Sequence, residues 1–161
     1  MTSDVDQFWM QHALSLAEAA GMLLEVPVGA IVVHEGRIIG SGINLRESVR
    51  QASAHAELLA IEDASRFLNA WRLQNCTLYV TLEPCLMCAG VIYQARIPRV
   101  VYGAVDPKGG ALGSLYQLNE DMRLNHRYVV RDRVMADESA QLLKDFFRMK
   151  RLSRSPTPAV D

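Results

Sequence analysis

The stretch TLYVTLEPCLMCAGVIYQARIP, residues 77–98, carries the pattern that decides the fold. Residues 77–82 are mainly apolar and β-branched, which predicts a buried strand. Pro84 suits the first turn of a helix, and apolar residues follow it as far as about Ala95. Pro98 stops this helix, because proline removes a backbone donor. The stretch is therefore a strand that passes directly into a helix.

Similar signals lie on both sides of this unit. Glu35-Gly36 separates two β-branched runs, residues 28–33 and 37–43, and indicates a hairpin. The other predicted elements are strands over 99–104 and 128–131, helices over 9 to about 21, 54 to about 67 with Ser53 as N-cap, and 137–151, and a flexible glycine-rich loop over 106–113. A hairpin followed by alternating strands and helices favours an α/β sheet with helices on both faces. Sites in such sheets lie where a strand ends and the next helix begins.

Length and composition narrow the functional classes. The chain has 161 residues, of which 50% are hydrophobic and 22% charged, and this fits a single folded domain over 1–151. Residues 152–161 contain two prolines and are expected to be a disordered tail. No run approaches the roughly 18 apolar residues of a membrane span, and the acidic start is unlike a signal peptide, so we expect a cytoplasmic protein without a membrane partner. A net charge of −1 means that any nucleic-acid contact must use a local basic patch.

The three cysteines point to a metal and not to disulfides. Cys85 and Cys88 are three residues apart in a first helical turn, so both sulfurs can reach one ion. A neutral imidazole from His55, at another helix start, completes a set of three ligands. Three protein ligands leave an open position, and on a catalytic metal that position holds an activated water. Cys76 lies nine residues before Cys85, near the opposite end of the sheet, and is expected to be a buried structural thiol.

Glu57 supplies the acid–base chemistry that such a metal needs. It follows His55 by two positions, so its side chain leaves the helix in another direction and can face the metal-bound water. A carboxylate there can pass a proton from water to a leaving nitrogen. Taken alone, a C-x-x-C pair is often a redox pair or chance, and a lone histidine is often a core residue. H-x-E together with P-C-x-x-C is far more specific and indicates a catalytic zinc.

These motifs resemble those of the zinc-dependent nucleoside and nucleobase deaminases, the cytidine/deoxycytidylate deaminase superfamily. Over roughly residues 7–151 the chain is similar to the bacterial tRNA-specific adenosine deaminases, the TadA family. The similarity rests on His55-Ala56-Glu57, on TLEPCLMCAG at 81–90, and on EVPVGA at 25–30, Asn44, Ala104, DPK at 106–108, Gly110-Ala111, Gly113-Ser114, NHR at 125–127 and DFFRM at 145–149.

The resemblance implies a three-layer cytidine deaminase-like α/β fold, with helices on both faces of a mixed five-stranded sheet. It implies one zinc ion per subunit, a homodimer, and an anticodon stem-loop as partner. The implied reaction is hydrolytic deamination of adenosine to inosine at the tRNA wobble position, in bacteria chiefly of an arginine tRNA, by a zinc-bound hydroxide. The implied site residues are Glu57 as proton shuttle, His55, Cys85 and Cys88 as zinc ligands, and Val28, Asn44, Ala56, Asp106, Lys108, Asn125, His126, Phe147 and Arg148 for the substrate.

Other interpretations of single residues stay open. Asn44 can simply cap a turn, His126 can bond to backbone, and Phe146, at helical spacing, is expected in the core. At the level of function, the alternatives are a zinc deaminase of a free compound such as guanine, cytosine or cytidine, and a non-catalytic, zinc-stabilised RNA-binding domain. Glu57 argues against the second, because a structural zinc site has no use for that carboxylate.

Overall fold

The computed structural model describes residues 2–154 and contains one central sheet with helices around it. The helices are α1 (Thr2–Met22), α2 (Arg46–Val49), α3 (Ala56–Leu68), α4 (Leu86–Gln94) and α5 (Ala136–Leu152), with a 3₁₀ turn at Leu118–Glu120. The strands are β1 (Gly29–His34), β2 (Arg37–Ile43), β3 (Cys76–Leu82), β4 (Arg99–Ala104) and β5 (Val129–Arg131).

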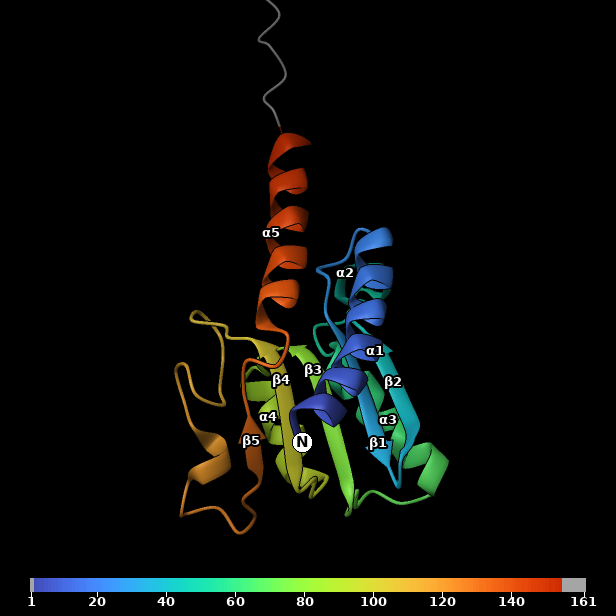
Figure 1. The fold of residues 1–161 in the computed structure, drawn as a ribbon, viewed down its shortest axis with the longest axis vertical. Coiled ribbons are helices and arrows are strands. Elements are labelled where there is room, and N and C mark those ends of the chain that lie inside the picture. The colour runs from blue at the N-terminus through green and yellow to red at the C-terminus, as the bar shows by residue number, and fades with distance from the viewer. Residues whose placement is uncertain (1, 155–161) are drawn as a thin grey trace, which may run out of the picture.

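The sheet has the order β2-β1-β3-β4-β5 and is mixed (Figure 1). Strand β1 runs antiparallel to β2 and β3, whereas β3, β4 and β5 run parallel to one another. Alternate residues of β1 enter two separate cores: Val32 packs with Ala60 of α3, whereas Ile31 packs with Ala13 of α1. Helices therefore cover both faces, and the predicted three-layer α/β fold is confirmed.

Close packing of α3 on β2 places the start of α3 beside the sheet. A β-carbon at Gly40 would lie 2.3 Å from the carbonyl oxygen of Ala60, and one at Gly42 would lie 2.3 Å from that of Ala56. Glycine at both positions lets the helix backbone approach the strand without a clash. The beginning of α3 is thereby fixed next to the pocket described below.

The first helix was predicted to start at residue 9, but α1 begins seven residues earlier, at Thr2. Two other predicted helix starts are wrong by two residues each. Ser53 is not the N-cap of α3: its carbonyl accepts the amide of His55 in a turn, and His55, with φ −84° and ψ 151°, is the N-cap. Helix α4 begins at Leu86 with Cys85 as N-cap, and not at Pro84. The short helix α2 was not predicted, because four residues without a buried side chain leave no periodic pattern.

Helix α5 differs from the expected core helix. Its last turns extend beyond the sheet (Figure 1), and it includes Leu152, one residue past the predicted end. Phe146, expected in the core, is only half-buried, with its ring edge-on to Phe147 at a centroid distance of 5.3 Å. Most of the predicted tail, residues 155–161, lies outside the described residues. Within the described part, no helix has both the length and the hydropathy for crossing a membrane.

A buried carboxylate joins α1 to three strands. The Asp6 side chain is 2% exposed and accepts hydrogen bonds from Tyr79 at 2.9 Å, from Arg99 at 2.7 and 2.8 Å, and from Arg131 at 2.5 Å. Burial alone would raise the pKa of Asp6, but these hydrogen bonds outweigh it and lower the pKa from 3.8 to about 2. The folded state is thus stabilised by the ionised group above about pH 4, and this stabilisation is lost as the pH falls toward 2.

Asp6→Asn is therefore expected to lower the free energy of unfolding at pH 7 by about 2 kcal/mol. Between pH 4 and 2 the wild-type value should fall toward that of the variant, as measured by urea unfolding. Asp132→Asn is the matched control, because Asp132 is 46% exposed in its ion pair with Arg133. Surface pairs of this kind contribute at most about 1 kcal/mol. Equal effects of the two substitutions would contradict the assignment of Asp6.

Candidate active site

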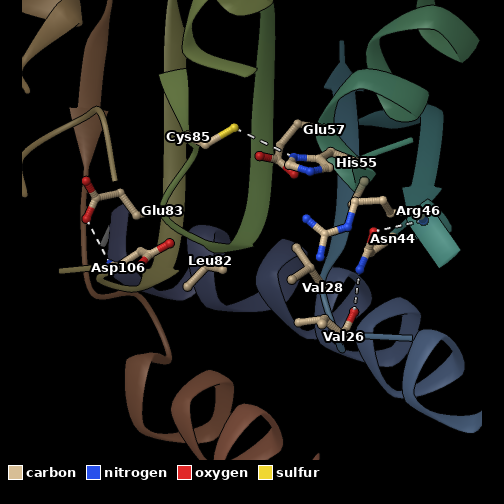
Figure 2. A pocket seen from close by; sticks show the side chains of 11 residues that line it. Val26, Val28, Asn44, Arg46, His55, Glu57, Leu82, Glu83, Cys85 and Asp106 are labelled. Carbon is tan, nitrogen blue, oxygen red and sulfur yellow. Dashed lines mark hydrogen bonds between the residues drawn. The ribbon is translucent and has the colours of Figure 1, made fainter. Parts of the chain in front are cut away.

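A pocket of about 160 Å³ lies where the beginnings of α3 and α4 face the end of β3 (Figure 2). Its lining includes seven residues that the sequence analysis singled out: Val28, Asn44, His55, Ala56, Glu57, Cys85 and Asp106. Cys88 lies fully buried beside it, one turn along α4 from Cys85. As predicted, residues from distant parts of the sequence meet at the end of a strand.

The geometry of His55, Cys85 and Cys88 fits a metal ion. Their ligand atoms all lie within 4.8 Å of one another, and His55 Nδ1 is 3.6 Å from each of the two sulfurs. A tetrahedral zinc with its usual bond lengths separates a nitrogen and a sulfur ligand by about 3.6 Å. One imidazole and two thiolates are also donors that zinc prefers. Among the described residues, this is the group of histidine, cysteine and acidic side chains close enough to share an ion.

The ionisation of the protein groups favours a cation at this position. A hydrogen bond from Cys88, together with His55, lowers the pKa of the Cys85 thiol from 9.0 to about 3. The same hydrogen bond and burial raise the pKa of Cys88, and the hydrogen bond with Cys85 raises that of His55. Negative charge is thus already held on one sulfur. A bound cation replaces the remaining protons and stabilises both thiolates.

Glu57 is buried in the same pocket. Its side chain is 4% exposed, and desolvation raises the pKa of its carboxyl above the ordinary 4.5. Figure 2 shows the carboxylate next to the His55 ring, on the side of the pocket that faces Cys85. A carboxyl group with a raised pKa, beside a metal-binding group, can both accept and return a proton near neutral pH.

Asn44 forms the opposite wall together with Val28. The Nδ2 atom of Asn44 donates to the carbonyl of Val26 at 3.2 Å, and its Oδ1 accepts the amide of Arg46 at 3.2 Å. The Asn44 side chain therefore also caps a turn, which was the alternative interpretation of this residue. Each of its two polar atoms has a further hydrogen-bonding position, so the amide can still recognise a ligand.

The loop after β4 is held by Glu83, a residue with no predicted role. The Glu83 carboxylate, 2% exposed, accepts hydrogen bonds from the amides of Asp106 at 3.1 Å, Leu112 at 3.2 Å and Ser114 at 3.0 Å. A β-carbon at Gly110 would lie 2.0 Å from Glu83 Oε2, so any larger residue there would displace this carboxylate from its hydrogen bonds. The segment expected to be a flexible loop is thus tied to the strand that leads to Cys85.

A second, larger cleft of about 1070 Å³ opens beside the pocket. The two share Val26, Arg46, Leu82 and Asp106 in their linings. The cleft also contains the predicted substrate residues Lys108 and Phe147, and most of its charge is positive. Its cations are Arg46, Lys108, Lys144, Lys150, Arg151 and Arg154. Although the whole chain has a net charge of −1, this surface supplies the local basic patch that a nucleic acid requires.

Three predicted substrate residues lie outside both cavities. Arg148 is exposed on α5 and is not among the residues that line the cleft. Asn125 accepts a hydrogen bond from Tyr93 and is exposed, and His126 Nε2 lies 3.0 Å from the carbonyl oxygen of Ile97. Backbone bonding of His126 was one of the two interpretations left open. The role of all three in substrate binding stays a prediction.

Two buried carboxylates were missed although the sequence marks both. Glu83 is the one charged residue in the stretch 77–95, and Glu25 is the one charged residue in the apolar stretch 22–33. A single acidic residue in an apolar run must find hydrogen-bond donors if it is buried. This signal predicts an internal partner, but it does not say which segment provides it.

Comparison with known proteins agrees with the site. The model of the MafB19-like deaminase family matches residues 5–151. A tRNA-specific adenosine deaminase of Streptococcus pyogenes serotype M1 is 46% identical over 144 residues, covering 89% of this chain and 84% of that protein. The same name belongs to a Bacillus subtilis protein that is 46% identical over 143 residues, covering 89% of each. A structure from a study of A-to-I editing by tRNA:A34 deaminases superposes with a TM-score of 0.80 at 42% identity, covering 83% of this chain and 97% of that one. The chain therefore belongs to the MafB19-like deaminase family and to the tRNA-specific adenosine deaminases.

Proposed function

We propose that this chain hydrolytically deaminates adenosine to inosine at the wobble position of a tRNA anticodon, with one zinc ion held by His55, Cys85 and Cys88. The observation that carries the proposal is the buried Glu57 carboxyl in the same pocket as a three-ligand group, beside a basic cleft. The relatives named for this activity share nearly half of the aligned residues. A non-catalytic role explains neither the carboxyl nor the pocket.

Hydrolysis forms a bond from C6 of adenine to oxygen and breaks the bond from C6 to the exocyclic nitrogen. Both protons of the attacking water must therefore move, one to ring N1 and one to the leaving ammonia. When bound, zinc supplies the Lewis acidity that makes water nucleophilic near neutral pH. Glu57 accepts the proton of that water through its carboxylate and donates it to the departing nitrogen. Its burial keeps the exchanged proton away from solvent.

The base fits between the walls described above. Val28 offers an apolar surface, the backbone of Ala56 borders the base edge, and the free positions of the Asn44 amide face the nucleotide. A flipped adenosine can enter from the basic cleft, whose cations attract the flanking phosphates. Phe147, 43% exposed in that cleft, offers a ring for base stacking.

We further propose a cytoplasmic homodimer. Large apolar side chains are exposed near the metal-binding group, among them Leu86 at 50%, Leu115 at 55% and Tyr116 at 51%. A second copy of this chain would cover such a surface. Preference for an arginine tRNA also stays a prediction, because the described residues include no feature that selects one anticodon.

The test is incubation of the purified zinc-loaded protein with an anticodon stem-loop that contains a wobble adenosine. Parallel reactions contain free adenosine, guanine, cytosine and cytidine, and chromatography measures the products. Inosine is expected in the stem-loop, with at least about a hundredfold lower kcat/KM for the free compounds because they lack the contacts of the basic cleft. Turnover confined to free compounds would show that the substrate is not RNA.

A further inference from the structure

Helix α2 forms one side of the pocket mouth but has little stability of its own. It consists of four residues, has no buried side chain, and its N-cap residue Leu45 makes no capping hydrogen bond with its side chain. A helix of one turn does not persist in water without external contacts. Arg46, its first residue, lines both the pocket and the basic cleft, and Figure 2 shows its guanidinium pointing into the pocket.

Asn44 Oδ1 accepts the amide of Arg46, and the next two amides of α2 are capped by Glu25, a residue 22 to 23 positions earlier in the chain. Its carboxylate accepts the amide of Glu47 at 3.3 Å and the amide and hydroxyl of Ser48 at 2.5 and 2.7 Å. These amides belong to the first turn of α2 and have no partner within the helix. A capping carboxylate normally comes from the N-cap residue itself, whereas here it comes from another segment.

The environment of Glu25 keeps it ionised for this purpose. Its side chain is 1% exposed, and burial alone would raise its pKa. Hydrogen bonds from Ser48 and Glu47 outweigh burial, so the pKa of the Glu25 carboxyl lies below its ordinary value. The carbonyls of Val26 and Val28 accept hydrogen bonds from Asn44. These bonds hold the segment just before α2 beside the segment that follows Glu25.

We propose that Glu25 is a positioning residue that holds α2 in place and thereby keeps Arg46 at the junction of the pocket and the basic cleft. A nucleotide that enters the pocket from the cleft passes this junction, where a guanidinium can bind its phosphate. This role rests on the function proposed above. It predicts an effect on substrate binding and none on the chemistry, because Glu25 is not among the residues that line either cavity.

The test uses Glu25→Gln in the zinc-loaded protein with the stem-loop substrate. The amide NH₂ of glutamine faces at least one of the three donors and loses that hydrogen bond. KM is expected to rise about tenfold while kcat changes by less than about threefold, the signature of lost binding. Trypsin cleavage after Arg46 and Arg50, followed by mass spectrometry, is expected to accelerate by a similar factor because α2 opens more often.

Three variants make the test specific. Glu47→Gln is the matched control, because only the main chain of Glu47 contacts Glu25, and it should leave KM and cleavage unchanged. Ser48→Ala removes one donor and should give a smaller change in the same direction, which keeps the test valid if Glu25→Gln folds poorly. Combining Glu25→Gln with Arg46→Ala should raise KM no further than Arg46→Ala alone.

The outcomes separate this role from the function on which it rests. An inactive wild type on the stem-loop contradicts the proposed function, while the cleavage rates still report on Glu25. Unchanged cleavage after Arg46 in Glu25→Gln overturns the positioning role. An equal loss of kcat and kcat/KM overturns it too, because that result would place Glu25 in the chemical step.

Discussion

Glu57→Gln is expected to lower kcat for stem-loop deamination by about a thousandfold, while zinc content stays at one ion per chain. Glutamine has nearly the same shape as glutamate, so the pocket is preserved, but an amide cannot take up and return a proton at neutral pH. Single-turnover measurement of inosine, at saturating RNA, isolates this step from product release. Zinc is quantified in the same samples by atomic emission.

Glu62→Gln is the matched control for that variant. Glu62 lies on the same helix α3 but is exposed, so its neutralisation should leave kcat within about twofold of wild type. Unchanged stem-loop affinity of Glu57→Gln would show that the loss is in catalysis and not in binding. Activity of Glu57→Gln near that of wild type would rule out the proton-shuttle role.

The sequence predicts the fold well where local patterns decide it. Strand β4 was predicted with the boundaries that it has in the structure, because Pro98 precedes it and Val100, Val101 and Tyr102 favour a strand. Helix starts were less accurate. The residues before α3 and α4 adopt extended or turn backbone to place His55 and Cys85 as N-caps, although neither side chain makes a capping hydrogen bond. The usual preferences favour Ser53 as an N-cap and Pro84 as a first helical residue. The geometry of the site overrides both.

The residues of the candidate site also differ in how far local patterns predict them. His55, Glu57, Cys85 and Cys88 were predictable because two local motifs contain all four. Parts of the site that depend on long-range contacts were not predictable. Arg46 lines the pocket from a helix that Glu25 caps across more than twenty residues, and no spacing rule links the two.

Helix α5 shows a further limit of sequence patterns. Leu143 and Phe147 have the spacing of a core-facing stripe, a pattern typical of buried residues, although the resemblance assigned Phe147 to the substrate. Both line the open basic cleft, but Leu143 also packs against the core, whereas Phe147 is 43% exposed. An apolar stripe shows which side of a helix is apolar, but it does not show whether another element covers that side.

Cys88→Ser is expected to reduce zinc content from one ion per chain to less than about a tenth, and deamination with it. The Cys88 side chain is fully buried with its sulfur 3.6 Å from His55 Nδ1, so its loss leaves two of the three expected zinc ligands. A serine hydroxyl is a weak zinc ligand because it stays protonated at neutral pH. Zinc binding also stabilises the folded state, so a chelator should lower the melting temperature of wild type and leave that of Cys88→Ser unchanged.

Cys76→Ala is the control that makes this result specific to the site. Cys76 is buried as predicted, at the opposite end of β3, and burial raises its pKa to about 11, which disfavours the thiolate that zinc requires. Its replacement should therefore lower stability through lost packing but retain one zinc per chain and the response to chelator. If Cys88→Ser kept its zinc while Cys76→Ala lost it, the ligand set would be wrong. The proton-shuttle role of Glu57 would then lose its basis, because it depends on an ion that Cys88 would help to hold.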